Sequence, residues 1–272
     1  MIMVFKTDYY SLSHPPEIQF SIPGVKLPSS RDVFFRAKQR EIVEQYFSAR
    51  KMLSETACSD WGHWLPLKET TPENVRAGFQ AKYKAIFYES ALFFYNALVD
   101  LSWTMCYACA EFSLLSDGER IDLSGVIPID EAAKLLRIAE ANVTAPTAEA
   151  NPFGYLKKMC PEFTKAIDLI ICFWENFSDS GIRKKYNYCK HRGKPLYNET
   201  LSIQTPKPIG VYILAQGEKH ELPAEAKDVQ LSFSLDDSIA ELQQFDDEIL
   251  FPYLQALIAE LERVINPSPL AI

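Results

Sequence analysis

The stretch from Thr71 to Phe112 contains one glycine and, after Pro72, no proline. Thr71 is a favourable N-cap residue, Pro72 suits the first helical turn, and Glu73 complements the positive end of the helix dipole. A helix of about forty residues is roughly 60 Å long, at 1.5 Å per residue. Beyond Ala85 it is apolar around most of its circumference, so we expect it at the centre of a helical bundle.

Apolar residues at helical spacing, with capping signals at the ends, predict four further helices over residues 30–58, 131–141, 161–177 and 235–266. Only 10 of the 272 residues are glycine, which also favours helices over a many-turned β fold. Pro252 is expected to kink the last of these helices.

Residues 195–234 differ from the rest of the chain. Four prolines in this segment argue against a helix, and β-branched or alternating runs predict short strands at 209–214 and 229–235. The sequence therefore predicts an all-α fold. It is a helical bundle with one long central helix and a small β-hairpin insertion, in a single domain over residues 1–272.

Charge and cysteine content limit the function classes. The net charge of −8 argues against a protein that coats nucleic acid over its whole surface. The six cysteines show no disulfide framework or zinc-ligand spacing, so we expect reduced thiols, no metal and no cofactor. The first residues do not resemble a secretory signal, and Asp100 interrupts the most apolar run. We expect a cytoplasmic protein that does not enter a membrane.

A basic segment, residues 183–194, stands out in this acidic chain. It holds six Lys or Arg residues, one His and no acidic residue. The preceding Ser178–Ser180 predicts a helix from about Gly181 to Lys190. On it, Arg183, Asn187 and His191 are spaced by four residues and share one face.

These residue types suit a phosphate pocket. Arg183 would grip a phosphate bidentately, the imidazole of His191 would move a proton, and Asn187 would orient that imidazole or a substrate hydroxyl. The neighbouring cations Lys184, Lys190 and Arg192 would add phosphate contacts. The alternative is structural: cations near a helix C-terminus stabilise the dipole, and Gly193 would end the helix.

The phrase Tyr186-Asn-Tyr-Cys-Lys-His-Arg-Gly193 resembles the helix-start motif of uncharacterised bacterial members of the HEPN superfamily of helical nucleotide-binding and ribonuclease domains. The resemblance covers the helical portions, with Arg183 preceding His191 late in the chain. Seven residues separate Arg183 from His191, whereas active ribonucleases of the family leave four to six.

The resemblance implies a metal-independent endoribonuclease of toxin or defence type. His191 would transfer a proton at a ribose 2′-hydroxyl, and Arg183 or Arg192 would hold the scissile phosphate. It also implies a homodimer with RNA or a nucleotide as ligand. The competing hypothesis is a non-catalytic helical domain whose basic segment caps a helix or docks a protein partner.

A polar stripe on the long predicted helix offers a counterpart to the basic segment. It includes Asn96 and Asp100 together with Trp103 and Tyr107. One interpretation is the solvated face of an amphipathic helix. The other is a polar seam in which Asp100 pairs with Arg183 or orients the His191 ring, with Asn96 in support.

Overall fold

The computed structural model describes residues 30–57, 68, 70–110, 130, 134, 156–158, 160–203, 209–215, 218–224 and 230–265. Helices predominate among them and the strands are short, so the predicted all-α fold with a small strand insertion is confirmed. Apart from residue 134, which is helical, the predicted helix at 131–141 lies outside the described residues. The contacts define two compact units. The first includes Arg50–Phe93 and Gly181–Gln244, and the second includes Phe5–Ala49, Phe94–Ser180 and Phe245–Ile272. The prediction of one domain over residues 1–272 stays a prediction.

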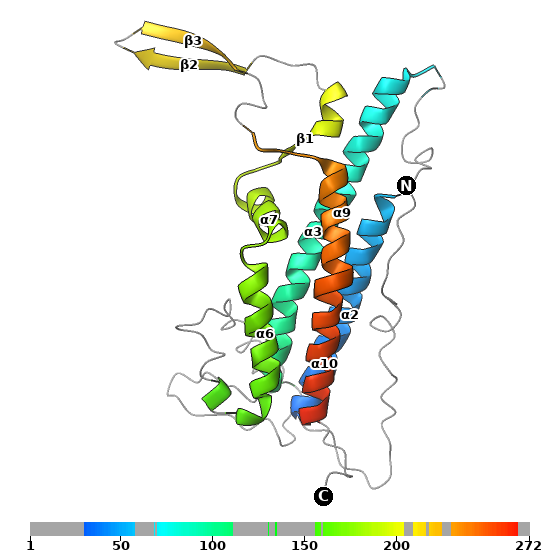
Figure 1. The fold of residues 1–272 in the computed structure, drawn as a ribbon, viewed down its shortest axis with the longest axis vertical. Coiled ribbons are helices and arrows are strands. Elements are labelled where there is room, and N and C mark those ends of the chain that lie inside the picture. Colours follow the sequence, from blue (N-terminus) through cyan, green and yellow to red (C-terminus); the bar gives the residue numbers. More distant parts are fainter. Residues whose placement is uncertain are drawn as a thin grey trace, which may run out of the picture. The chain divides into compact units, whose positions relative to one another are not determined.

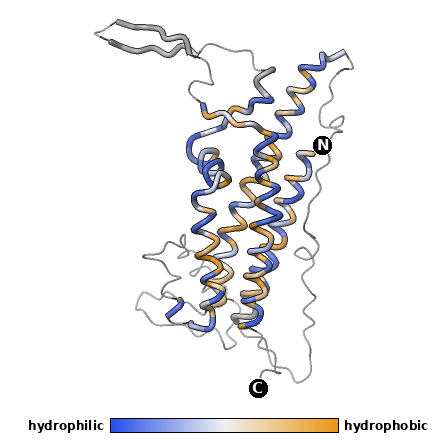
Figure 2. Tube along the Cα trace, in the orientation of Figure 1, coloured by the Kyte–Doolittle hydropathy of each residue, from blue (hydrophilic) through white to orange (hydrophobic). Residues whose placement is uncertain are grey.

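The longest described helix is α3 (Glu73–Cys109), with 37 residues, as its sequence predicts (Figure 1). Helix α2 (Ser30–Glu55) precedes it. Five apolar residues at helical spacing along α2 are fully buried: Phe35, Ile42, Tyr46, Ala49 and Leu53. Figure 2 shows hydrophobic residues recurring along these helices, the pattern from which they were predicted. Among the described residues, no helix has the length and apolar character needed to cross a membrane.

The core of the second unit is rich in aromatic contacts. Its elements, besides parts of α2 and α3, are η1 (Pro161–Phe163), α6 (Thr164–Phe177), η3 (Asp246–Leu250) and α10 (Phe251–Ile265). The Phe173 ring of α6 stacks on the Tyr253 ring of α10, with 4.0 Å between centroids. Trp103 of α3 meets Trp174 of α6 edge to face at 4.8 Å. These contacts join helices that are far apart in the sequence.

The last helical stretch is not a uniform α-helix. Helix α9 (Leu235–Phe245) continues into the π-helical turn η3 and then into α10. Pro252 lies two residues after the end of this turn. A proline ring clashes with the preceding helical turn and has no N–H to donate, and a locally widened helix relieves both effects. The kink expected at Pro252 stays a prediction.

The strands differ in part from their predicted places. β2 (Ile209–Ala215) pairs antiparallel with β3 (Glu218–Ala224), whereas β1 (Leu196–Tyr197) pairs in parallel with β4 (Ser232–Phe233). The prediction of the second strand at 229–235 was wrong for most of that range. Pro223 lies opposite Gly210 near the end of the hairpin, where a two-stranded ribbon tolerates it because each strand is an edge.

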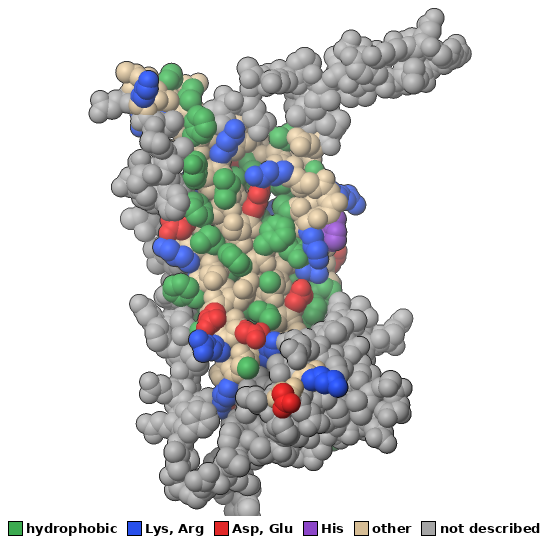
Figure 3. Space-filling model, turned by 180° about the vertical axis from the view of Figure 1, so that it is seen from behind, with side chains coloured by type: hydrophobic (Ala, Val, Ile, Leu, Met, Phe, Trp, Pro, Cys, Tyr) green, Lys and Arg blue, Asp and Glu red, His purple; other side chains and the backbone are tan. Residues whose placement is uncertain are grey.

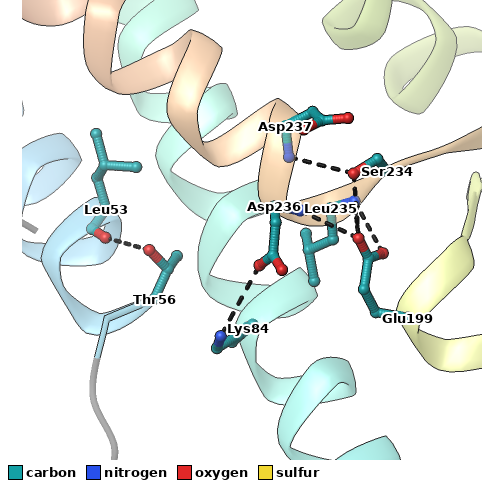
Figure 4. A network of polar contacts seen from close by, with 8 residues as sticks. All are labelled: Leu53, Thr56, Lys84, Glu199, Ser234, Leu235, Asp236 and Asp237. Carbon is teal, nitrogen blue, oxygen red and sulfur yellow. Dashed lines mark hydrogen bonds and ion pairs between the residues drawn. The ribbon is translucent and has the colours of Figure 1, made fainter. Parts of the chain in front are cut away.

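A carboxylate from the insertion caps α9. Glu199, in η2 (Asn198–Ile203), accepts hydrogen bonds from the backbone N–H groups of Leu235 at 2.9 Å and Asp236 at 3.3 Å (Figure 4). The Ser234 hydroxyl accepts the N–H of Asp237 at 3.2 Å and so caps the first turn of α9. Burial opposes ionisation of Glu199, but the backbone hydrogen bonds outweigh it and lower the pKa of its carboxyl.

Candidate functional site

Most of the basic segment lies on helix α7 (Gly181–His191), within the first unit, as predicted. At its C-terminal end the carbonyl of Tyr188 accepts the N–H groups of Arg192 at 2.8 Å and Gly193 at 3.2 Å. Gly193 has a φ of 121°, a conformation that favours glycine. The predicted role of Gly193 in ending the helix is confirmed.

One side of α7 packs against the rest of the first unit. Ile182 and Tyr186, four residues apart, are buried. The Tyr186 ring meets the Phe93 ring of α3 edge to face, with 5.1 Å between centroids. Tyr188 accepts the backbone N–H of Leu231 at 3.1 Å through its hydroxyl. These contacts hold α7 in one rotational orientation about its axis.

The other side of α7 faces solvent and carries most of the predicted site. The exposed residues are Lys184, Asn187, Lys190, His191 and Arg192. Arg183 is half-buried because its guanidinium lies over the Tyr186 ring, 5.0 Å from the centroid. The ammonium of Lys190 lies 5.6 Å from the same centroid. The helix therefore brings the predicted residues 183–192 together on one element.

Lys185 and Lys194 of the basic segment lie beside acidic partners. Lys185 forms an ion pair with Glu241 of α9, and Lys194 lies 3.4 Å from the Glu89 carboxylate of α3. Neither Lys190 nor Arg192 forms an ion pair with a described residue. The exposed end of α7 thus keeps cations that are open to an external anion.

Two polar groups near the C-terminal end of α7 are held in their protonated, unreactive forms. Tyr197 is buried near the carboxylate of Glu89, and both burial and that negative charge raise the pKa of its hydroxyl. Burial, followed by the charge of Glu89, raises the pKa of the Cys189 thiol to about 11. Cys189 is therefore protonated at neutral pH and is a poor nucleophile. The described His, Cys, Asp and Glu residues form no group of three that would hold a metal ion.

Asn96 and Asp100, the predicted supporting residues, belong to the second unit. Asn96 is fully buried and Asp100 is exposed. Trp103 and Tyr107 of the same stripe are buried, so the interpretation of the stripe as a solvated face is wrong for these positions. Pairing of Asp100 with Arg183 or His191 stays a prediction.

Sequence reasoning did not find the residues that surround the basic segment. Phe93 and Glu89 of α3 and Glu241 of α9 contact it, and the smallest sequence separation among these contacts is the 56 residues between Lys185 and Glu241. Nothing in local spacing marks such partners, since they are set by tertiary packing. Only Phe93 of these three could have been noticed in the sequence, because it is a large apolar residue near the edge of the polar stripe.

Comparison with models of known protein families, with curated proteins and with solved structures gives no match to this chain. What defines its class is therefore its own structure: an all-α protein with a small strand insertion and a solvent-facing basic helix.

Proposed function

We propose that this chain binds RNA or a nucleotide through phosphate contacts on the exposed side of α7. The observation that supports this most is the set of exposed cations in a segment without an acidic residue, on a protein whose net charge is −8. Lys190 and Arg192 flank His191 there and have no described ion-pair partner. Local positive charge of this kind attracts phosphate against the overall charge of the chain.

At the Tyr188 carbonyl, backbone groups form the cap without these cations. The Tyr188 carbonyl is already satisfied by two backbone N–H groups, and the φ of Gly193 completes the C-terminal turn. Side-chain cations are not needed to satisfy that carbonyl. Their remaining structural contribution is a favourable interaction with the helix dipole, about 0.3–1 kcal/mol each.

The relationship to the HEPN superfamily and the homodimer it implies are part of this proposal. They are supported by residues 186–193 and by the all-α fold. In such a dimer two α7 helices would share one ligand, and binding would depend on protein concentration. Light scattering on the purified protein tests this, and a monomer at all concentrations would contradict it.

The binding proposal is tested by fluorescence anisotropy with a labelled single-stranded RNA over a range of salt concentrations. The logarithm of the affinity falls as the logarithm of the salt concentration rises, and each lost phosphate contact makes this slope shallower by about 0.7. The double variant Lys190→Ala/Arg192→Ala is expected to weaken binding and to make the slope shallower by about 1.4. Lys165→Ala, which removes an exposed lysine from α6, is the matched control. Equal affinity of the double variant and the control would overturn the proposal.

Cleavage of the bound RNA is the second candidate, because the His191 imidazole is exposed between two cations. A His in that place would move a proton while Arg192 or Arg183 holds the phosphate. Total RNA is incubated with the protein and a chelator between pH 5 and 8. Turnover that His191→Ala abolishes, with RNA affinity retained, supports catalysis. If the RNA remains intact at every pH, the cleavage hypothesis is wrong and the binding proposal stands.

A further inference from the structure

Phe93 is an exposed aromatic residue beside the basic segment. Phe93, on α3, is 41% exposed to solvent, and with Ile86 it is one of two large apolar residues of this helix that are exposed among the described residues. The Phe93 and Tyr186 rings are inclined at 68° to each other. In an edge-to-face pair of this kind, Tyr186 covers at most one face of the Phe93 ring. Because 41% of Phe93 is exposed, part of it is accessible to a further aromatic partner.

Two cations lie against the Tyr186 ring of the Phe93–Tyr186 pair. Arg183 and Lys190 both lie over the Tyr186 ring, at 5.0 and 5.6 Å from its centroid. Tyr186 therefore contacts the exposed Phe93 ring and two positively charged side chains, and all of them lie close together on the surface. Figure 3 shows hydrophobic, basic and acidic side chains interspersed on the visible face. An aromatic ring next to cations is the arrangement by which proteins hold unpaired nucleotides.

We propose that Phe93 stacks against a base of single-stranded RNA whose phosphates Arg183 and Lys190 contact. This inference rests on the proposed function and names its substrate class. A base exposes a face for stacking only when it is unpaired, so the ligand is a single strand or a loop rather than a duplex. Stacking tolerates every base, and therefore little sequence preference is expected.

The charge at this surface favours RNA over a protein partner. Ile86, seven residues before Phe93 and so on the same side of α3, is also exposed. Two such residues alone would suit an apolar partner. A purely apolar partner covering Phe93 would also remove the neighbouring cations from water without compensation, whereas RNA phosphates neutralise them.

The test compares Phe93→Leu, Phe93→Trp and the matched control Phe47→Leu, which changes an equally exposed phenylalanine of the second unit. Leucine keeps an apolar contact with Tyr186 but has no π face. Affinities are measured for a single-stranded RNA, for the same strand with abasic sites, and for an RNA duplex. Thermal unfolding verifies that each variant is folded.

Phe93→Leu is expected to weaken single-strand binding about 5- to 100-fold, the range contributed by one stacked base. Phe93→Trp and Phe47→Leu retain wild-type affinity, and abasic sites weaken wild-type binding but not that of Phe93→Leu. Duplex affinity is the same in all variants.

If Lys190→Ala/Arg192→Ala weakens binding while Phe93→Leu and abasic sites do not, the stacking inference is wrong and the proposed function stands. If wild-type protein shows no salt-sensitive RNA binding, both are wrong. A change in oligomeric mass on Phe93→Leu, with RNA affinity unchanged, assigns the surface to protein association and overturns the inference.

Discussion

The Tyr95 hydroxyl donates a hydrogen bond of 2.7 Å to the carboxylate of Asp246, a residue 151 positions later in the chain. Asp246 is fully buried and opens the π-helical turn η3. A buried carboxylate depends on such donors, because it has lost the hydrogen bonds of water. The contact ties α3 to the irregular part of the last helical stretch within the second unit.

Removing that donor is expected to destabilise the protein. Tyr95→Phe should lower the free energy of unfolding by about 1–3 kcal/mol, since a buried acceptor loses a partner. Urea unfolding measures this. In an Asp246→Asn background the loss should be smaller, because a hydrogen bond to a neutral amide is weaker than one to a carboxylate. Equal losses in both backgrounds would contradict the assigned role of the contact.

The Glu199 cap should make stability depend on acid pH. The pKa of Glu199 is lowered in the folded state, so its stabilising effect is complete above its unfolded pKa of about 4.3 and is lost as pH falls through the folded value. Glu199→Gln should cost about 1 kcal/mol at pH 7. The cost should vanish in strong acid. Glu175→Gln, at an exposed position on α6, is the control and should show little change at either pH.

Cys189 should react with alkylating reagents far more slowly than its partial exposure suggests. Its pKa of about 11 leaves almost no thiolate at pH 8. Peptide mass spectrometry after iodoacetamide treatment should find the exposed Cys172 modified and Cys189 unmodified. In denaturant Cys189 should titrate near its ordinary pKa of about 8.5.

The same raised pKa has a consequence for alkaline stability. The folded protein holds the Cys189 proton more tightly than the unfolded chain, so stability should fall as pH rises from about 8.5 towards 11. Cys189→Ala should remove this part of the pH dependence. Rapid labelling of native Cys189 at pH 8 would show that burial does not suppress its ionisation.

Gly181 should tolerate a side chain only when Glu241 is shortened. A Cβ on Gly181 would overlap the carboxylate of Glu241, which Lys185 holds by an ion pair. Gly181→Ala should therefore destabilise the wild-type protein by roughly 1 kcal/mol. In a Glu241→Ala background it should be neutral or slightly stabilising, because alanine is the better helix former. Additive effects in this double-mutant cycle would show that the two residues do not interact.

Much of the helical structure could be predicted from local sequence. The caps at Ser234 and Gly193 and the long apolar run of α3 act through neighbouring residues, so their signals are readable without the fold. The four-residue spacing of Arg183, Asn187 and His191 likewise follows from the helical period. The second strand of the hairpin was missed because Glu218–Ala224 has no β-branched residue and contains Pro223.

By itself, then, the sequence determined where most of the helices lie, the buried face of α2, and the concentration of cations on α7. Only the tertiary structure decided which of those cations remain available. Lys185 and Lys194 are occupied by Glu241 and Glu89, and Phe93 is brought beside Tyr186. The physical reason is range: helix formation depends on residues within a turn of each other, whereas ion pairs and ring contacts depend on which distant faces pack together.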